Sequence, residues 1–417
     1  MKPLRKKIYV AAGYSTVFMG SGRKEFDPSK AQRSFDSYLK ETAEGTLAQG
    51  IDPNSIEMGV IGSFMAARFL NQGNLPGFLP FMVPGLRYRP CYAVEGACGT
   101  GGRAIGVGVL GILADQADTV FVAAFEIQNG VKAVYGADIL AGAGYYDKER
   151  KQGHAFFFPG VFSERAGAYY EKYGYEPTRK GMAAWYEQSI LNARKNPKAQ
   201  EFENSSPDLL KRGMADPNPQ KFVPHLTGTD CSKVSDGAAS LILLSEEGLK
   251  RSGIKKDAVI EIVAIAQAED DITQPPKDLT VLTTTETAVK EALKDAGIEL
   301  SDLGWLEIHD CFSITAILTI EALGFAPKGQ GAQFIAEGKT KPDGIIPTNL
   351  SGGLCGFGHP TGASGVRMLV DLHAQMTGKA ANQVSSRKKY GMMISMGGND
   401  KTVTVLIAVQ PESSSVA

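Results

Sequence analysis

The chain has 417 residues, of which 43% are hydrophobic and 21% are charged, and its formal net charge is −1. A chain of this length exceeds one ordinary domain, so we expect two or three packed units around a large core. The near-neutral charge gives no basis for a nucleic acid or an anionic membrane as a partner. The five cysteines include no CxxC pair, which argues against a structural zinc site and favours reduced thiols in a cytoplasmic protein.

The N-terminal region begins with basic residues, and the apolar run that follows is broken by Gly13. This run is too short for a signal peptide and predicts a first strand over residues 7–12. No other stretch is apolar for long enough to cross a membrane. The C-terminal PESSSVA matches neither a peroxisomal nor an endoplasmic-reticulum retention signal.

Strands and helices alternate in the next part of the chain. The apolar periodicity predicts helices within 30–50 and over 100–114, and strands over 57–64, 91–95 and 119–124. Such an alternation is typical of an α/β protein, in which helices cover both faces of a sheet.

Residues 127–228 have a different composition, rich in aromatic and charged residues and then in Pro, Asn and Asp. We interpret them as an inserted subdomain of helices and irregular loops. Its aromatic side chains either hold together a small satellite core, which is the commoner use of such residues, or line a pocket. They include Phe156, Phe157, Phe158, Tyr169, Tyr170, Tyr173, Trp185 and Tyr186.

The strand pattern returns after this insertion. Strands are predicted over 231–245, 255–268, 303–309, 391–396 and 402–409, and helices over 283–296, 312–323 and 365–376. Both halves contain a Gly-rich loop followed by an apolar helix and an apolar strand, a weak internal repeat. The sequence therefore predicts an N-terminal half (1–126 plus 229–250), an insertion (127–228) and a C-terminal half (251–417), with both Gly-rich loops at one crevice.

Cys98 lies in the first Gly-rich loop, GACGTGG, just before the predicted helix 100–114. Unpaired N–H groups and the dipole at a helix N-terminus favour an anion, so we expect a lowered pKa for this thiol. The small neighbouring residues leave room for an acyl group. The alternative is a buried structural thiol, the commoner fate of a free cysteine.

Two histidines also stand at predicted junctions between elements. His359 lies in the second Gly-rich loop, GFGHPTGASG, and could act as a general base toward a thiol. His309 lies in IHDCFS at the end of a predicted strand, where α/β folds place their sites, with Cys311 two residues further on. Alone, each is more often structural, but together they suggest a cysteine nucleophile with a histidine base, and SMGGND offers backbone N–H groups for an oxyanion.

Taken together, these motifs resemble those of thiolases over nearly the whole chain, and most of all the branch typified by the thiolase domain of sterol carrier protein X. GACGTGGRAI is similar to the nucleophile loop, and CSKVSDGAAS to the segment after the loop domain, while HDCFS and GGLCGFGHPTGASG are the most specific pieces. The resemblance implies two similar βαβαβαββ halves packed in five layers (α-β-α-β-α) with an inserted loop domain.

The resemblance also implies catalytic roles. Cys98 would be the nucleophile that accepts the acyl group, and His359 would activate it. His309 and His359 would bind the thioester oxygen of the enolate, and the N–H groups of Cys98 and Gly397 would bind the other oxyanion.

Many thiolases have a second cysteine as acid/base in a late CxG motif, and Ser395 occupies that place here. The sterol-carrier branch is implied to use the cysteine of HDCF instead, which makes Cys311 the acid/base candidate. The Ser395 hydroxyl is too weak an acid to replace the thiol of the cysteine that many thiolases have at this position.

The implied reaction is thiolytic cleavage of a 3-ketoacyl-CoA, or the reverse Claisen condensation, with coenzyme A as co-substrate and without a metal. The aromatic insertion resembles that of bacterial thiolases of aromatic degradation, such as a benzoylsuccinyl-CoA thiolase. A second carboxylate on such a substrate, or the CoA phosphates, could meet basic residues of the insertion. The candidates are Arg165, Arg179, Arg194 and Lys195.

By resemblance we expect a homodimer core, and a small zinc-containing OB-fold protein as a possible partner. Two other functions remain open. One is a condensing enzyme of the ketoacyl-synthase type, although the GHPTGASG and HDCFS motifs favour a thiolase. The other is a non-catalytic subunit that binds lipid or acyl-CoA, against which the complete set of cysteines and histidines argues.

Overall fold

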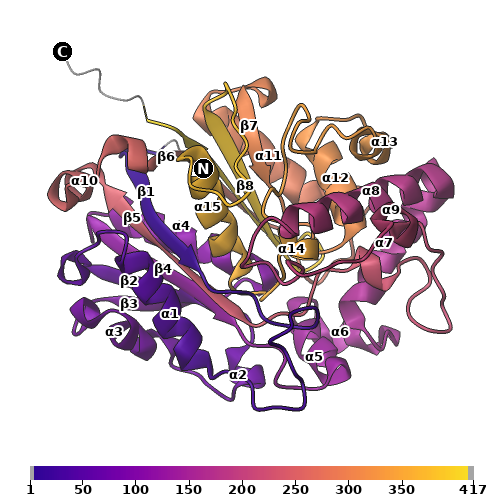
Figure 1. Cartoon of the computed structure of the whole chain (residues 1–417), viewed down its shortest axis with the longest axis horizontal. Helices are drawn as coiled ribbons and strands as arrows, with labels where there is room; N and C mark the ends of the chain where they lie inside the picture. Colours follow the sequence, from indigo (N-terminus) through magenta and orange to yellow (C-terminus); the bar gives the residue numbers. More distant parts are fainter. Residues whose placement is uncertain (1–3, 412–417) are drawn as a thin grey trace.

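The computed structural model describes residues 4–411, so of the C-terminal PESSSVA only Pro411 lies within the described residues. Within this range, nine strands form one sheet in the order β3-β2-β4-β5-β1-β6-β9-β8-β7. Figure 1 shows the N-terminal strands on one side of this sheet and the C-terminal strands on the other, with the insertion packed beside the C-terminal part. No helix of the described residues is long and apolar enough to span a membrane.

The N-terminal half contributes the strands from β3 to β1. Its elements are β1 (Ile8–Ser15), α1 (Phe35–Leu47), β2 (Met58–Gly62), α2 (Ala66–Phe69), α3 (Leu79–Met82), β3 (Cys91–Val94), α4 (Thr100–Leu113), β4 (Thr119–Glu126), β5 (Gly237–Ser245) and α10 (Glu246–Ser252). β4 and β5 are buried along their whole length, as expected for strands covered on both faces.

The C-terminal half repeats this arrangement. Its elements are β6 (Ile260–Glu269), α11 (Thr283–Ala296), β7 (Leu303–Glu307), α12 (Ser313–Leu323), α13 (Gly331–Ala336), α14 (Gly353–Gly356), α15 (Ser364–Met376), β8 (Tyr390–Gly397) and β9 (Thr402–Val409). From the outer edge inward, β7-β8-β9-β6 has the same parallel and antiparallel pairings as β2-β4-β5-β1. The predicted repeat of two similar halves is therefore confirmed.

One strand of the repeat is reduced in the second half. The counterpart of β3 is a single parallel bridge between Leu306 and Thr348. Pro347 stands beside this bridge and has no N–H to donate to a ladder, which limits the pairing. The predicted βαβαβαββ order thus holds for the first half, whereas the third strand of the second half is no more than this bridge.

The predicted elements agree with the structure within a few residues, with one informative exception. The strand predicted over 231–245 begins only at Gly237. The residues before it form separate bridges instead, Cys231 with Phe312 and Val234 with His359. This segment therefore runs past both histidine-bearing stretches before it enters the sheet.

Helices α4 and α15 cross in the middle of the molecule, where Gly101 and Gly365 are in contact. A Cβ on Gly101 would lie 2.6 Å from the Val366 nitrogen and 2.8 Å from the Gly365 Cα, closer than real side chains approach. Glycine lowers helix stability, but here it allows two backbones to touch. The contact brings together the N-terminal ends of the two helices, one preceded by Cys98 and the other by His359.

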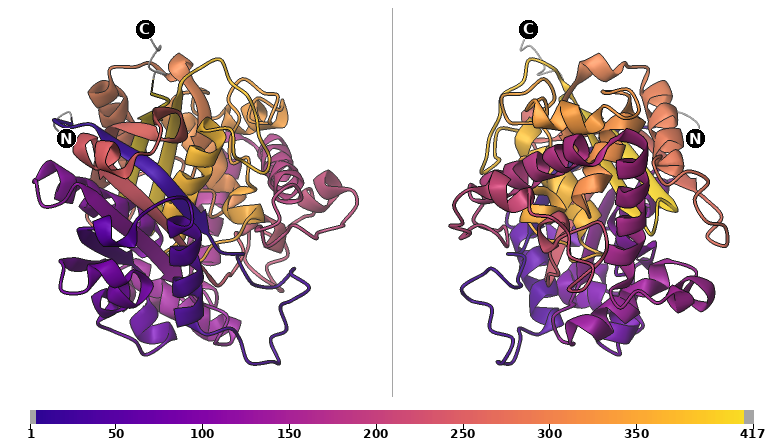
Figure 2. Two further views of the ribbon diagram at one scale, coloured as in Figure 1. Left: turned by 60° about the vertical axis from the view of Figure 1, so that its left-hand side comes forward. Right: turned by 90° about the vertical axis from the view of Figure 1, so that its right-hand side faces the viewer.

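The insertion consists mainly of helices, which are α5 (Ala133–Leu140), α6 (Tyr146–Glu149), α7 (Phe157–Tyr173), α8 (Tyr175–Ala193) and α9 (Leu209–Gly213). Of these, α7 and α8 pack on the C-terminal half, while α5 contacts α2 of the N-terminal half. α8 contacts α12, α13 and α14, and both views of Figure 2 show the insertion against the C-terminal elements.

The aromatic residues of the insertion divide between two clusters, because Tyr186 forms a small satellite core with Ile190 and Leu209, whereas most of the others are buried against the C-terminal sheet. Phe157, Tyr169 and Trp185 of the insertion belong to the same buried cluster as the residues of the C-terminal sheet. The composition indicated an insertion correctly, but it could not show that its apolar faces would be buried against α12 and its neighbours.

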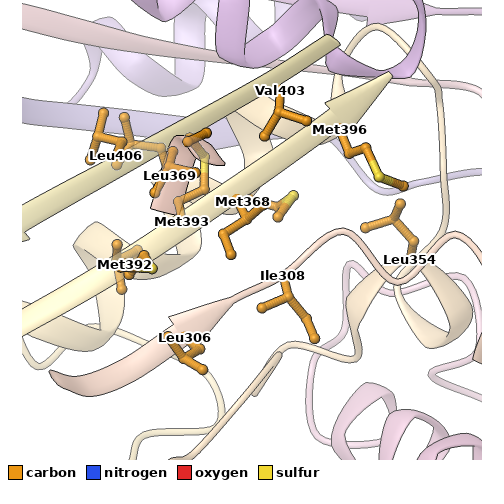
Figure 3. Close-up of a cluster of buried hydrophobic side chains, with 14 of the residues drawn as sticks. Leu306, Ile308, Leu354, Met368, Leu369, Met392, Met393, Met396, Val403 and Leu406 are labelled. Carbon is orange, nitrogen blue, oxygen red and sulfur yellow. The ribbon is translucent and has the colours of Figure 1, made fainter. Parts of the chain in front are cut away.

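The core beneath the ends of β7 and β8 is shown in Figure 3. Leu306 lies in β7, and Ile308 follows the end of this strand. Around them lie side chains from three other elements, which are Met368 of α15, Met393 and Met396 of β8, and Leu354 of α14. Each of these side chains is at most 2% exposed. Such dense packing fixes the segment that continues from Ile308 into His309.

Candidate active site

A tight turn holds Cys98 at the start of α4. Ala97 adopts the left-handed conformation with φ of 53°, which is unfavourable for a residue with a Cβ. The Thr100 hydroxyl donates to the Ala97 carbonyl (2.6 Å) and accepts from the Gly96 N–H (3.0 Å). Strain of this kind persists where the surrounding structure enforces it, which is common beside reactive residues.

His309 and His359 lie face to edge next to this cysteine. Their ring centroids are 5.1 Å apart with an interplanar angle of 81°. The Cys98 sulfur and one nitrogen of each ring all lie within 4.8 Å of one another. The structure therefore brings together three residues that the sequence predicted from separate motifs.

Ser364 determines which nitrogen of His359 carries the proton. The serine hydroxyl donates to the Pro360 carbonyl (3.0 Å), so it accepts a hydrogen bond from Nδ1–H of His359 (2.7 Å). The other nitrogen, Nε2, has no partner among the described residues. This assignment leaves the Nε2 lone pair available to take a proton from a thiol.

Burial keeps all three groups neutral. It raises the pKa of Cys98 to about 12, with the Glu126 carboxylate as a second cause, although hydrogen bonds from the backbone of Gly398 and of Cys98 itself act in the opposite direction. The expected lowering of this pKa by the helix N-terminus is thus wrong, because loss of solvent outweighs the helix donors. Burial also lowers the pKa of His309 to about 3, and that of His359 well below its usual value.

Cys311 is buried near Cys98. Burial raises its pKa, and the nearby Cys98 is the second cause. Its sulfur lies 3.6 Å from the Thr315 hydroxyl. A neutral thiol in this position can donate a proton and take it back, as an acid/base group must.

Asp310, between His309 and Cys311, anchors this segment. Its carboxylate accepts hydrogen bonds from the Trp185 indole (3.0 Å), the Asn349 amide (2.9 Å) and the Leu354 N–H (2.7 Å). Burial nevertheless raises its pKa to about 6. The bonds to three separate segments fix the backbone on either side of Asp310.

The late Gly-rich turn SMGGND lies next to the cysteine loop. A Cβ on Gly397 would lie 2.9 Å from the Gly99 nitrogen, so the two backbones are in contact. The N–H of Gly398 also interacts with the Cys98 sulfur. The sequence had indicated this turn as a donor but had singled out only Gly397.

Ser395 occupies a different environment from the catalytic groups. Its buried hydroxyl has no partner among the described residues. A Cβ built on Gly102 would lie 2.9 Å from the Ser395 Cβ, and a Cβ built on Gly365 would lie 2.7 Å from the Ser395 hydroxyl oxygen. The side chain thus fills the space between α4 and α15.

Glu126, at the end of β4, is a buried residue to which the sequence analysis gave no role. It accepts from the Phe64 N–H (2.8 Å) and the Ser63 hydroxyl (3.0 Å) on one side, and from the Thr361 hydroxyl (3.1 Å) on the other. It therefore connects the end of β2 to the His359 loop. A lone carboxylate at the end of an entirely apolar strand was the signal that could have revealed it.

The basic residues of the insertion are engaged with the protein itself. The Arg165 guanidinium is buried and donates to the carbonyls of Leu279 and Val281. Arg179 is buried and paired with Asp230 at 2.8 Å. The structure gives both a role in holding loops, which corrects the expectation that they meet substrate.

Of the other two candidates, Arg194 also bonds the protein itself, whereas the Lys195 side chain does not have a hydrogen bond among the described residues. Arg194 donates to the carbonyls of Asn204 and Ser206. Lys195 is exposed, and its role in binding CoA phosphates stays a prediction.

A cavity of about 650 Å³ lies between α5, α7 and the segment after β1, and its lining residues do not include Cys98, His309, Cys311 or His359. Its lining is largely apolar, with the four phenylalanines Phe26, Phe69, Phe156 and Phe158. Phe158 also packs in the cluster that contains Ala97. Gln128, another lining residue, donates to the His359 carbonyl at 2.8 Å.

The three central residues can perform two kinds of chemistry. A thiol beside an imidazole lone pair can attack a carbonyl while the ring takes its proton. Sulfur and imidazole nitrogen are also ligands that Zn²⁺ accepts, so Cys98, His309 and His359 are the described residues that could hold a metal. The expectation of a metal-free reaction stays a prediction.

A repeated α/β fold with a cysteine and two histidines at the junction of its halves defines a class of acyl-transferring proteins, and comparison with known proteins identifies the family. Residues 265–409 match the family model described as Thiolase C-terminal domain-like. An acetyl-CoA acetyltransferase of Methanothermobacter thermautotrophicus is 30% identical over 376 residues, which cover 90% of this chain and 94% of the relative. The chain belongs to the thiolase superfamily.

Other proteins are similar at lower identity. The benzoylsuccinyl-CoA thiolase subunit BbsB of Thauera aromatica is 27% identical over 89% of this chain and 90% of its own length. An Ltp2-ChsH2(DUF35) aldolase structure superimposes with a TM-score of 0.78 at 18% identity, covering 98% of this chain and 99% of the other. Human mitochondrial 3-ketoacyl-CoA thiolase in complex with CoA gives 0.71 at 18%, with the same coverage. These two structures confirm the predicted thiolase fold.

Proposed function

We propose that the protein is a thiolase that cleaves a 3-ketoacyl-CoA, or forms one by the reverse Claisen condensation, through an acyl group carried on Cys98. The observation that supports this proposal most directly is the cluster of Cys98, His309 and His359 within 4.8 Å. A neutral thiol requires a neutral base to take its proton, and Nε2 of His359, which has no partner among the described residues, can serve as that base.

In the cleavage direction, Cys98 attacks the 3-keto carbon as Nε2 of His359 takes the thiol proton. The N–H groups of Cys98 and Gly397 stabilise the oxyanion that forms. The carbon–carbon bond then breaks, and the enolate of the leaving acyl-CoA is stabilised by His309 and by the now protonated His359. Cys311 donates the proton that completes this first product.

In the second half-reaction, coenzyme A is the co-substrate. Cys311, now a thiolate, takes the proton from the CoA thiol, and the CoA sulfur attacks the acyl-Cys98 carbonyl. Collapse of this intermediate releases the shortened acyl-CoA and the Cys98 thiolate, which takes back the proton that His359 received in the first half-reaction. The result is two-step covalent catalysis of the ping-pong type.

The first prediction concerns the covalent intermediate. Incubation with acetyl-, acetoacetyl-, benzoyl- or succinyl-CoA should add one acyl mass to the intact protein, on the peptide that contains Cys98. Free CoA should remove the adduct, and Cys98→Ser should not form it. An intact chain that takes no acyl group from any donor, alone or with a partner subunit, would favour the non-catalytic alternative.

We propose a bulky apolar acyl group, such as an aromatic one, as the finer specificity. The supporting observation is the cavity of about 650 Å³, which is within the range of sites for small organic ligands and far larger than an acetyl group requires. The similarity to a benzoylsuccinyl-CoA thiolase subunit agrees with this choice.

The second prediction tests this cavity. Phe158→Ala should change the ratio of kcat/KM for benzoylsuccinyl-CoA to that for acetoacetyl-CoA by roughly tenfold, since one apolar contact contributes about 1–3 kcal/mol of discrimination. The matched control is Ile272→Ala, which shortens an apolar side chain in a second cavity beside Asn399. Equal efficiency of the wild type on both substrates would contradict the aromatic specificity.

Assembly is a separate proposal. β3 is one of the two outer strands of the sheet and carries the half-exposed Tyr92, so a homodimer would cover an open edge. A solved neighbour is an Ltp2-ChsH2(DUF35) aldolase, which supports a partner subunit for this chain, and a small zinc-containing OB-fold protein is the partner that we propose. Light scattering with and without such a subunit tests both proposals. The boundaries 1–126 plus 229–250, 127–228 and 251–417, and the cytoplasmic location, also stay proposals.

A further inference from the structure

Arg367 is a completely buried arginine on the first turn of α15. Its Nη1 donates to a carboxylate oxygen of Asp371 (2.7 Å), to the Ser351 hydroxyl (3.0 Å) and to a carboxylate oxygen of Glu307 (3.3 Å). Its guanidinium carbon also lies 4.9 Å from the centre of the Phe357 ring. The side chain thus touches three segments besides its own helix.

Two of these contacts lead directly to the catalytic histidines. Glu307 is the last residue of β7 and precedes His309 by two residues. Phe357 precedes His359 by two residues, in the loop that leads into α15. One guanidinium therefore contacts both of the segments that carry an imidazole.

This arrangement is a costly way to stabilise a fold. A buried ion pair loses much of its hydration energy, and apolar residues of similar size often stabilise a core as well or better. In addition, Nε and Nη2 of Arg367 have no partner among the described residues. A structural ion pair with Asp371 would need neither Glu307 nor the Phe357 ring.

We propose that Arg367 is a positioning residue that fixes the His309 segment relative to the His359 segment and so sets the distance between the two imidazoles. Arginine suits this function because its Nη1 binds the three polar partners while the planar guanidinium lies against the Phe357 ring, a stacking contact that a compact lysine ammonium does not reproduce. The buried positive charge also opposes protonation of both rings, in agreement with the lowered pKa of His309 and of His359.

The test compares two equally buried arginines, each paired with an aspartate. Arg367→Lys keeps the charge but loses the planar guanidinium, and Arg179→Lys makes the same change in the insertion, where the guanidinium bonds Asp230 and the Gly213 carbonyl. Both should lower the melting temperature. Only Arg367→Lys should lower kcat, by roughly tenfold or more because small displacements at a reacting centre are costly, with KM nearly unchanged. It should also slow alkylation of Cys98 by iodoacetamide.

Milder variants keep the test decisive if Arg367→Lys does not fold. Asp371→Asn and Ser351→Ala each weaken one contact of the guanidinium, and each should lower kcat and the alkylation rate in the folded enzyme. The proposal would be overturned if these folded variants had a kcat and a Cys98 alkylation rate within about twofold of the wild type, as we expect for Arg179→Lys. The kcat measurement rests on the proposed function, whereas the rate of Cys98 alkylation does not. A wild type without thiolase activity would therefore contradict the proposed function, and the alkylation rates would still test the role of Arg367.

Discussion

At the scale of single residues, the hydrogen-bond partner of His359 matters as much as the histidine itself. A neutral imidazole has one donor and one acceptor, and the chain Nδ1–H to Ser364 to the Pro360 carbonyl selects the form whose Nε2 can accept a proton. Cys98 needs such an acceptor because burial leaves its thiol protonated.

The prediction at this scale is Ser364→Ala. Loss of the acceptor for Nδ1–H allows the other tautomer and should lower kcat about fivefold to tenfold, because a typical hydrogen bond contributes about 1 kcal/mol. KM should change little. Kinetics on both variants measure this, with Ser364→Thr as the control that keeps the hydroxyl. Equal kcat values for wild type and Ser364→Ala would show that Ser364 does not select the tautomer.

The sequence was most informative at this scale, but it also misled in two respects. The motifs around Cys98, His309, Cys311 and His359 identified residues that the structure does bring together. The pKa of Cys98 was predicted in the wrong direction, because a loop motif shows the helix donors but not how much solvent the insertion removes. Arg165 and Arg179 were misjudged for the same reason, since charge alone does not reveal a buried partner.

At the scale of elements, the site depends on the contact between α4 and α15. The five glycines of α4 weaken it as an isolated helix, but Gly101 permits backbone contact with Gly365. The sequence predicted both helices within a residue or two from their apolar periodicity. It could not predict their crossing, which depends on how the two halves of the sheet pack.

We expect Gly365→Ala to disturb both stability and catalysis. The new methyl group would lie 2.6 Å from the Gly102 nitrogen and 2.7 Å from the Ser395 hydroxyl oxygen. Overpacking of this kind costs about 1–3 kcal/mol, and separation of the helices would move Cys98 away from His359. Urea denaturation and the Cys98 alkylation rate measure the two effects. Gly73→Ala, at an open position without a left-handed backbone, is the control for the effect of a glycine substitution as such.

At the scale of the whole molecule, the histidines make stability depend on pH. Burial lowers the pKa of His309 to about 3 and of His373 to about 4, whereas the unfolded chain has ordinary histidines near 6.5. Between these values the unfolded state binds more protons than the folded state. These groups therefore reduce the free energy of unfolding as the pH falls below about 6.5, while Asp310, with its raised pKa, acts in the opposite direction.

His373→Gln isolates one of these contributions, because His373 donates to the Ala258 carbonyl in a cavity away from Cys98. Between pH 7 and pH 5, the free energy of unfolding should fall less in the variant than in the wild type. The slopes of this free energy against pH should differ by the equivalent of up to one proton. Urea midpoints at several pH values measure this difference. Parallel curves for the two proteins would mean that His373 titrates normally in the folded state.

The division of the active site between the two halves has a consequence for folding. Cys98 comes from the first half and His359 from the second, and more than two hundred residues separate them along the chain. Contacts between such distant residues close slowly, after local helices and hairpins have formed. During refolding, the recovery of the proposed activity should therefore lag behind the recovery of the far-ultraviolet dichroism, since the chain regains most of its secondary structure before Cys98 meets His359.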